Sequence, residues 1–122
     1  MNERETLKIN TQGHLEIGGA DAVNLAKSFG TPLYVMDENY IRAMCRIYRD
    51  TIEKEYGGNG LGLYASKAFS CLAIYRIANS EGIGCDIVSG GELYTALHAG
   101  FPAEKMVLHG NNKLLDELTL AL

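Results

Sequence analysis

The feature that most constrains the fold is a repeated strand-then-helix pattern that begins near residue 31. Short apolar segments alternate with longer segments whose apolar residues recur at helical spacing, and Gly-rich joints separate them. This alternation is typical of parallel βαβ units, so an α/β fold is expected. The predicted strands are 31–36, 61–66, 83–89 and 105–109, and the predicted helices are 37–56, 71–81, 90–98 and 113 onward.

The first thirty residues follow a different pattern. Apolar residues alternate on both sides of Gly13 across residues 7–17, which predicts a short hairpin. Asp21 is a predicted N-cap for a short helix, and Gly30 is its predicted C-terminal stop.

Chain length limits how much of a larger fold is present. A complete (β/α)8 barrel needs about 250 residues, whereas this chain has 122 residues and about four predicted βα units. The chain also closes on an apolar helical stretch at residues 118–122 with no helix stop after it. We therefore expect part of a longer polypeptide, or alternatively an open four-stranded parallel sheet.

Composition excludes several classes of function. The net charge is −4, and no basic stripe of the kind that binds nucleic acid is visible. No apolar run approaches the ~20 residues of a membrane-spanning helix, and the first residues lack an apolar stretch, so no signal peptide is expected. The three cysteines lie far apart, which fits a reducing cytoplasm, and no His or Cys pair has metal-ligand spacing, so no metal site is expected.

Lys67 is the strongest candidate for chemistry. It follows the apolar strand predicted at 61–66, where desolvating an ammonium group is costly. At the carboxyl end of a parallel strand its amine can reach an active-site mouth, and burial there lowers the pKa of a lysine toward Schiff-base chemistry. The alternative interpretation is a lysine that simply extends to solvent at a strand end.

Two further candidates occupy neighbouring strand ends. Asp86 interrupts an otherwise apolar strand, so its carboxylate needs a partner, and Lys67 on the preceding strand is the predicted one. Alternatively, backbone N–H groups satisfy Asp86. His109 follows the fourth predicted strand, with Asn111 and Asn112 beyond it, and a site-lining role is expected for this polar run.

Other features have ordinary structural explanations. Residues 89–92 (Ser-Gly-Gly-Glu) form a strand-to-helix turn whose N–H groups could bind an anion, although Glu92 also fits a helix start. The apolar residues of helix 37–56 are expected in the core. Its charged residues are expected to form a solvated face, comprising Arg42, Arg46, Arg49, Glu53 and Glu55.

The segment Tyr-Ala-Ser-Lys-Ala at 64–68 resembles the YAxKA segment of the barrel-type (fold type III) pyridoxal-phosphate decarboxylases. The run Asp-Ile-Val-Ser-Gly-Gly-Glu-Leu at 86–93 is also similar to that family. Within the family, residues 13–19, 30–35, 99–102 and 109–113 resemble the branch that acts on meso-2,6-diaminoheptanedioate. One departure is Ser66, where the family usually has Val, and it adds a hydroxyl beside the lysine.

The resemblance implies fold and site. It implies that 31–122 form the first units of a (β/α)8 barrel, and that 1–30 belong to a second, β-rich domain. Lys67 would be the catalytic residue that carries pyridoxal 5′-phosphate, and Asp86 and His109 would also bind this cofactor.

The resemblance also implies activity and partners. The reaction would be decarboxylation to L-lysine in the cytoplasm, with a small amino acid as substrate and a homodimer at full length. Nucleic acid and membrane are not expected as partners. Decarboxylases of the same fold that act on ornithine, arginine or carboxynorspermidine remain alternatives, as does a non-catalytic homologue or fragment that binds the cofactor.

Overall fold

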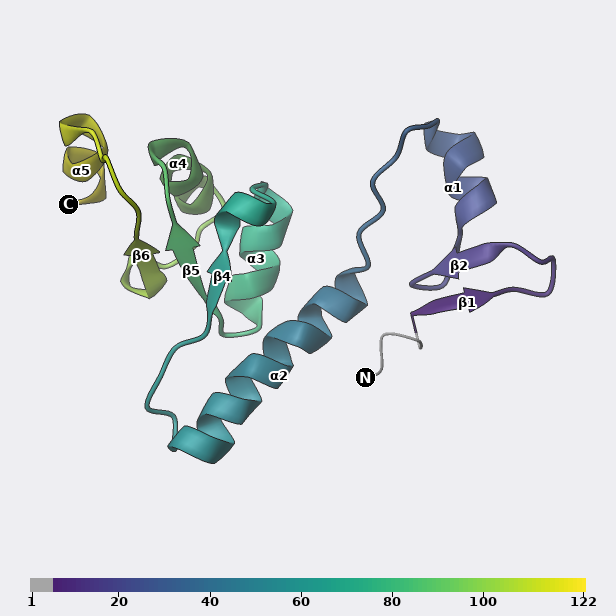
Figure 1. Ribbon diagram of the computed structural model, residues 1–122, viewed down its shortest axis with the longest axis horizontal. Helices are drawn as coiled ribbons and strands as arrows, with labels where there is room; N and C mark the ends of the chain where they lie inside the picture. Colours follow the sequence, from purple (N-terminus) through teal and green to yellow (C-terminus); the bar gives the residue numbers. More distant parts are fainter. Residues whose placement is uncertain (1–5) are drawn as a thin grey trace. The chain divides into compact units, whose positions relative to one another are not determined.

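The structure is a computed structural model that describes residues 6–122. The chain forms two compact units, one ending at Met44 and the other spanning Cys45–Leu122. The elements of both are labelled in Figure 1.

The first unit is built on a small antiparallel sheet. The predicted hairpin is confirmed, since Leu7 pairs with Ile17 and Ile9 with Leu15. Asp21 caps the following helix as predicted, because its Oδ1 accepts hydrogen bonds from the N–H groups of Val23 and Asn24 at 2.9 and 3.0 Å. These elements are β1 (Leu7–Ile9), β2 (Leu15–Ile17), β3 (Ala20–Asp21) and α1 (Ala22–Phe29).

Residues 31–36 do not form the predicted strand. They are irregular, and their side chains are exposed, with Tyr34 97% exposed. A strand exists only through backbone pairing, and this segment has no pairing partner within residues 6–122. The long helix that follows, α2 (Glu38–Tyr56), does form, and Asp37 Oδ1 accepts the N–H of Tyr40 at 3.1 Å.

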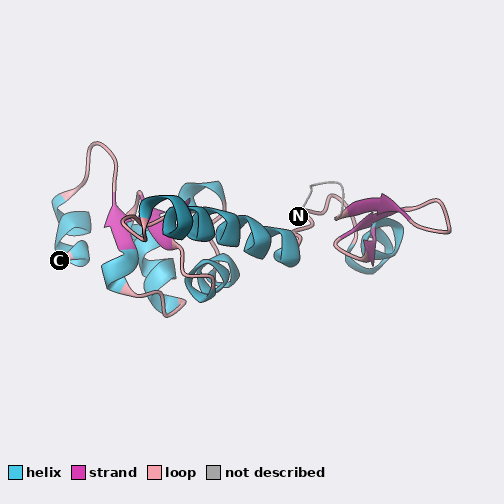
Figure 2. Ribbon diagram, turned by 90° about the horizontal axis from the view of Figure 1, so that it is seen from below, coloured by secondary structure: helices cyan, strands magenta, loops and turns pink. Residues whose placement is uncertain are grey.

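The second unit confirms the α/β class. Three parallel strands form a sheet in the order β4, β5, β6, and α3 and α4 follow β4 and β5 in the chain (Figures 1 and 2). The elements are β4 (Leu63–Ala65), α3 (Leu72–Ser80), β5 (Gly84–Ile87), α4 (Gly90–His98), β6 (Met106–Leu108) and α5 (Leu115–Ala121). Short 3-10 turns, η2 (Ser66–Ala68) and η3 (Ala103–Lys105), follow β4 and precede β6.

The core of the second unit lies around β5. Cys85 and Ile87 are fully buried, and Tyr75 of α3 meets Phe101 edge-to-face with ring centroids 6.2 Å apart. In contrast, α2 has no buried residue, and Ile47 and Tyr48 are 45% and 62% exposed, so the expectation that its apolar residues lie in a core is wrong for this chain.

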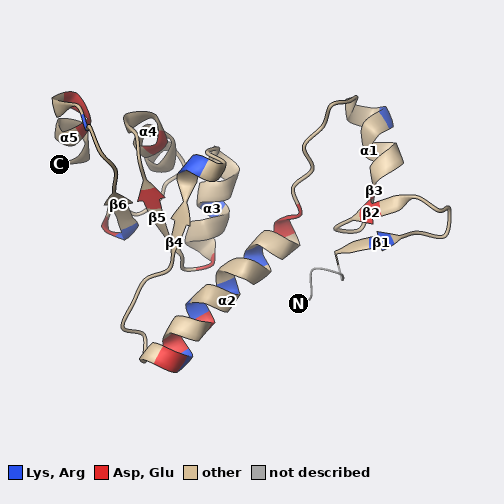
Figure 3. Cartoon of the chain, viewed as in Figure 1, with Lys and Arg blue, Asp and Glu red and all other residues tan. Residues whose placement is uncertain are grey.

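Basic and acidic residues recur along α2 (Figure 3), but not all of them form the solvated face that was predicted. Arg46 holds the buried carboxylate of Glu81 with two hydrogen bonds, at 2.6 and 2.8 Å, and Arg49 donates to the Glu81 carbonyl at 3.1 Å. These arginines therefore fasten α2 to the end of α3, a long-range role that helical spacing alone does not reveal.

Two kinds of structural feature are absent from residues 6–122. No helix in this range is long and apolar enough to cross a bilayer. Within the same range, no group of three His, Cys, Asp or Glu side chains has an arrangement that could hold a metal ion.

Candidate active site

The carboxyl ends of the three parallel strands place the predicted residues at one edge of the sheet. Ala65, the last residue of β4, pairs with Asp86 of β5, and Lys67 follows in the turn η2. His109 directly follows β6, and its N–H donates to the Ile87 carbonyl at 2.8 Å. Ligand sites of parallel sheets form at this edge.

Asp86 and His109 are brought together. His109 Nδ1 lies 3.7 Å from Asp86 Oδ1, which is longer than a hydrogen bond. Asp86 Oδ1 is buried and has no hydrogen-bond partner, so backbone N–H groups do not satisfy it. An uncompensated buried carboxylate oxygen is costly, and it is a position where a bound donor would be stabilised.

The environment of Lys67 differs from the predicted one. Its side chain is exposed rather than buried at a strand end, because β4 stops at Ala65 and the chain tightens into the turn η2. The predicted ion pair with Asp86 is not formed in the part of the chain that the structure describes. The amine therefore stands open to solvent at the strand edge.

The turn that carries Lys67 is anchored at two points. Ser66 is fully buried, and its hydroxyl donates to the Asp86 carbonyl at 2.8 Å. Tyr64 Oη donates to the Phe69 carbonyl at 2.8 Å.

Burial raises the pKa of the Tyr64 phenol and raises the pKa of the Cys85 thiol to about 11, so both remain protonated at neutral pH.

The Ser-Gly-Gly-Glu turn serves as a helix cap. Ser89 Oγ accepts the N–H of Glu92 at 3.3 Å, and Glu92 Oε2 accepts the N–H of Val88 at 2.7 Å. The N–H group of Gly90 donates a hydrogen bond to Glu117 Oε1 at 2.9 Å. Two of the predicted anion-binding donors, the N–H groups of Gly90 and Glu92, are thus engaged within the chain itself.

Sequence reasoning included Lys113 only as part of the polar run 109–113, and it missed Glu117. Lys113 Nζ donates to the Val88 carbonyl, and Glu117 binds the N–H groups of both Gly90 and Leu114. Hydrogen bonds from those two N–H groups lower the pKa of Glu117. Together they fasten the loop after β6, which begins at His109, to the turn after β5. The Lys-x-x-x-Glu spacing was the only sequence signal, and it is common on helices.

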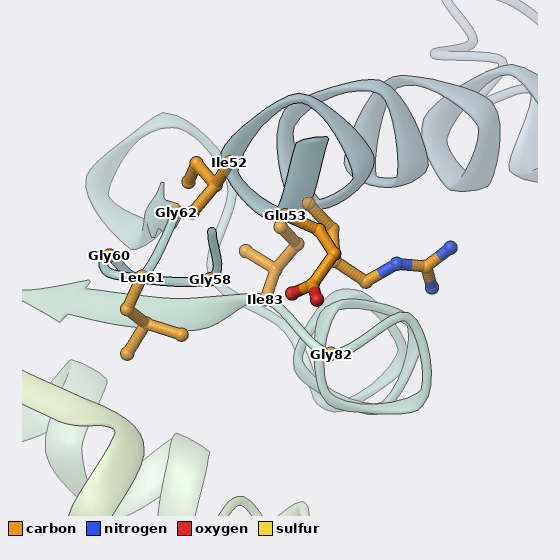
Figure 4. A pocket seen from close by; sticks show the side chains of 9 residues that line it. Ile52, Glu53, Gly58, Gly60, Leu61, Gly62, Gly82 and Ile83 are labelled. Atoms are coloured by element: carbon orange, nitrogen blue, oxygen red, sulfur yellow. The ribbon is translucent and has the colours of Figure 1, made fainter. Parts of the chain in front are cut away.

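A small pocket lies at the opposite edge of this sheet, where the strands begin (Figure 4). Gly62 immediately precedes β4 and Ile83 precedes β5, so the pocket is separated from Lys67 by the length of a strand. It is lined by Arg49, Ile52, Glu53, Gly58, Gly60, Leu61, Gly62, Gly82 and Ile83.

Comparisons with known proteins agree with this geometry. Diaminopimelate decarboxylases from Bacillus methanolicus and Bacillus subtilis (strain 168) are 53% and 50% identical to the chain over 117 residues, which is 96% of the chain. The crystal structure of diaminopimelate decarboxylase from M. jannaschii in complex with L-lysine is 40% identical, with a TM-score of 0.83 over 99% of the chain.

The match covers only part of those proteins. The chain spans 27% and 26% of the two Bacillus proteins and 28% of the M. jannaschii one. Residues 41–122 match the family described as pyridoxal-dependent decarboxylase, pyridoxal binding domain. The chain therefore belongs to the pyridoxal-dependent decarboxylases, and most of its length is their pyridoxal-binding domain.

Proposed function

We propose that this protein decarboxylates meso-2,6-diaminoheptanedioate to L-lysine, with pyridoxal phosphate held by Lys67. The support is the high identity to diaminopimelate decarboxylases and the L-lysine bound in a related structure. The observation that supports the site is that Lys67, Asp86 and His109 lie near or just beyond the carboxyl ends of three neighbouring parallel strands.

The residues present fit the cofactor. Lys67 offers a solvent-accessible primary amine, the group that reacts with a carbonyl. Asp86, which pairs with Ala65 two residues before Lys67, has a buried Oδ1 without a hydrogen-bond partner, an acceptor suited to a protonated nitrogen. When bound, pyridoxal phosphate supplies an electron sink for the pair left behind as carbon dioxide departs.

Each side chain has a distinct task in this proposal. Lys67 Nζ would hold the cofactor and, while displaced by the substrate amine, would supply the proton that replaces the lost carboxylate. Asp86 keeps a neighbouring nitrogen protonated by accepting its hydrogen bond at Oδ1. His109, whose side chain is 68% exposed and whose Nδ1 lies 3.7 Å from Asp86 Oδ1, would also bind the cofactor.

The wider architecture belongs to the same proposal. Residues 31–122 form the first units of a (β/α)8 barrel, and residues 1–30 contribute to a β-domain. A barrel accounts for two features of β4: within residues 6–122 this strand pairs on one side only, with β5, and Leu63 is 41% exposed. A cytoplasmic homodimer is the proposed working form.

Reductive labelling tests the cofactor lysine. The purified protein, at the full length at which it is made in the cell, is incubated with pyridoxal phosphate, reduced with borohydride and mapped by mass spectrometry. We expect label at Lys67 and little at Lys54, whose side chain is 81% exposed and lies on α2. Equal labelling of both lysines would overturn the assignment.

A substrate panel tests the reaction. Carbon dioxide release is measured with meso-2,6-diaminoheptanedioate, ornithine, arginine and carboxynorspermidine, for the wild type and for Lys67→Arg. We expect release from the first substrate alone and its loss in the variant, because a guanidinium cannot hold the cofactor. Faster release from one of the other three substrates would assign the protein to another member of the family.

A further inference from the structure

Ser66 makes a buried contact between the two halves of the candidate site. Its side chain is fully buried, and Oγ donates to the Asp86 carbonyl at 2.8 Å. Ser66 immediately precedes Lys67 in the turn η2, whereas Asp86 lies on the neighbouring strand β5. One hydroxyl thus joins the backbone that carries the lysine to the backbone that carries the carboxylate.

This bond lies where regular pairing stops. The last residue pair of the β4–β5 ladder is Ala65 with Asp86, and the chain then leaves the strand as a 3-10 turn. Beyond a ladder, the path of a turn depends on side-chain bonds to the sheet. An apolar residue at position 66 could fill the same space but could not donate to the Asp86 carbonyl.

The second hydrogen bond that holds the turn, made by Tyr64, does not fix the position of the turn relative to β5. Tyr64 Oη donates to the Phe69 carbonyl, but this bond connects residues of the same segment and is exposed. It closes the turn without fixing the turn to β5. Among the described side chains, Ser66 is therefore the one whose hydrogen bond connects this turn to β5, the strand that contains Asp86.

We propose that Ser66 is a positioning residue, which sets the location of Lys67 relative to Asp86 through its bond to the Asp86 carbonyl. The inference rests on the proposed function, in which Lys67 holds the cofactor. Ser66 does not touch the reacting atoms in this proposal. Its effect arises because small misplacements of a reacting group lower its rate strongly.

The test compares three variants of the full-length protein. Ser66→Ala removes the hydroxyl and adds no atoms, Ser66→Thr retains it, and Ser80→Ala is the matched control. Ser80 Oγ also donates to a backbone carbonyl at 2.8 Å, that of Ile77, but within α3. The readouts are the rate at which Lys67 reacts with pyridoxal phosphate, hydrogen exchange of the Lys67 amide without cofactor, and kcat and KM.

We expect Ser66→Ala to slow the reaction of Lys67 about tenfold or more, to speed exchange of its amide, and to lower kcat more than it raises KM. Ser66→Thr should restore most of the rate, and Ser80→Ala should match the wild type. Wild-type behaviour in Ser66→Ala, or an equal loss in Ser80→Ala, would overturn the role of Ser66 while leaving Lys67 as the cofactor lysine. Absence of reaction at Lys67 in the wild type would overturn both proposals.

Discussion

His109 Nδ1 lies 3.7 Å from Asp86 Oδ1, across the carboxyl ends of two neighbouring parallel strands. The oxygen is buried without a hydrogen-bond partner, although the imidazole next to it is largely exposed. A fold retains such an uncompensated acceptor at a cost in stability, and acceptors of this kind are concentrated at functional sites.

Asp86→Ala should therefore separate stability from function. Removing the orphaned oxygen should leave the free energy of unfolding unchanged or raise it by about 1 kcal/mol. Affinity for pyridoxal phosphate should fall at least about tenfold, since an interaction with a charged group is lost. Urea unfolding and cofactor titration measure the two effects, and a variant that loses stability but binds normally would contradict the assignment.

Arg46→Ala should destabilise the second unit. The substitution leaves the carboxylate of Glu81, whose side chain is 6% exposed, without its two-bond partner. We expect a loss of about 2 kcal/mol in denaturant unfolding, reduced from the value for a fully buried pair because Arg46 is 53% exposed. Lys54→Ala, which removes only an exposed pair with Glu55, should change stability by less than about 0.5 kcal/mol.

Gly84→Ala should also be destabilising, because β5 is crowded at that position. A Cβ there would lie 2.7 Å from the backbone carbonyl oxygen of Lys105 and 2.7 Å from Leu61 and Leu63 side-chain carbons. We expect a loss of about 1–3 kcal/mol by thermal or urea unfolding. Gly91→Ala is the control, since nothing lies within 4 Å of its Cβ position in α4, and it should be neutral or stabilising.

The first unit should lose stability in acid through Asp21. Its folded pKa is lowered from 3.8 to about 2, chiefly by the hydrogen bond from the Asn24 N–H and then by His14. Since the depressed pKa belongs to the folded state, the stabilisation is complete above pH ~4 and disappears as the pH falls toward ~2. Asp21→Asn retains a capping oxygen and should abolish this dependence, measured by hydrogen exchange of the α1 amides across that pH range. Unchanged acid sensitivity in this variant would contradict the role of Asp21.

Local signals in the sequence predicted much of the fold. Asp21 and Gly30 mark the two ends of α1, as predicted, because capping and backbone freedom act within a few residues. The strands at β4, β5 and β6 were predicted from their apolar runs, although each is shorter than expected. The strand predicted at 31–36 was wrong because pairing depends on a partner that local sequence does not contain.

By itself, the sequence determined the alternation of strands and helices, the family, and which residues follow the strand ends. Those properties depend on side-chain periodicity and on short motifs, which are local. Only the tertiary structure decided that Lys67 is exposed, that Asp86 Oδ1 lacks a donor, and that Ser66 bonds to the Asp86 backbone. Burial and hydrogen-bond partners depend on segments twenty or more residues apart meeting in space, and no local pattern encodes which atoms then come within reach.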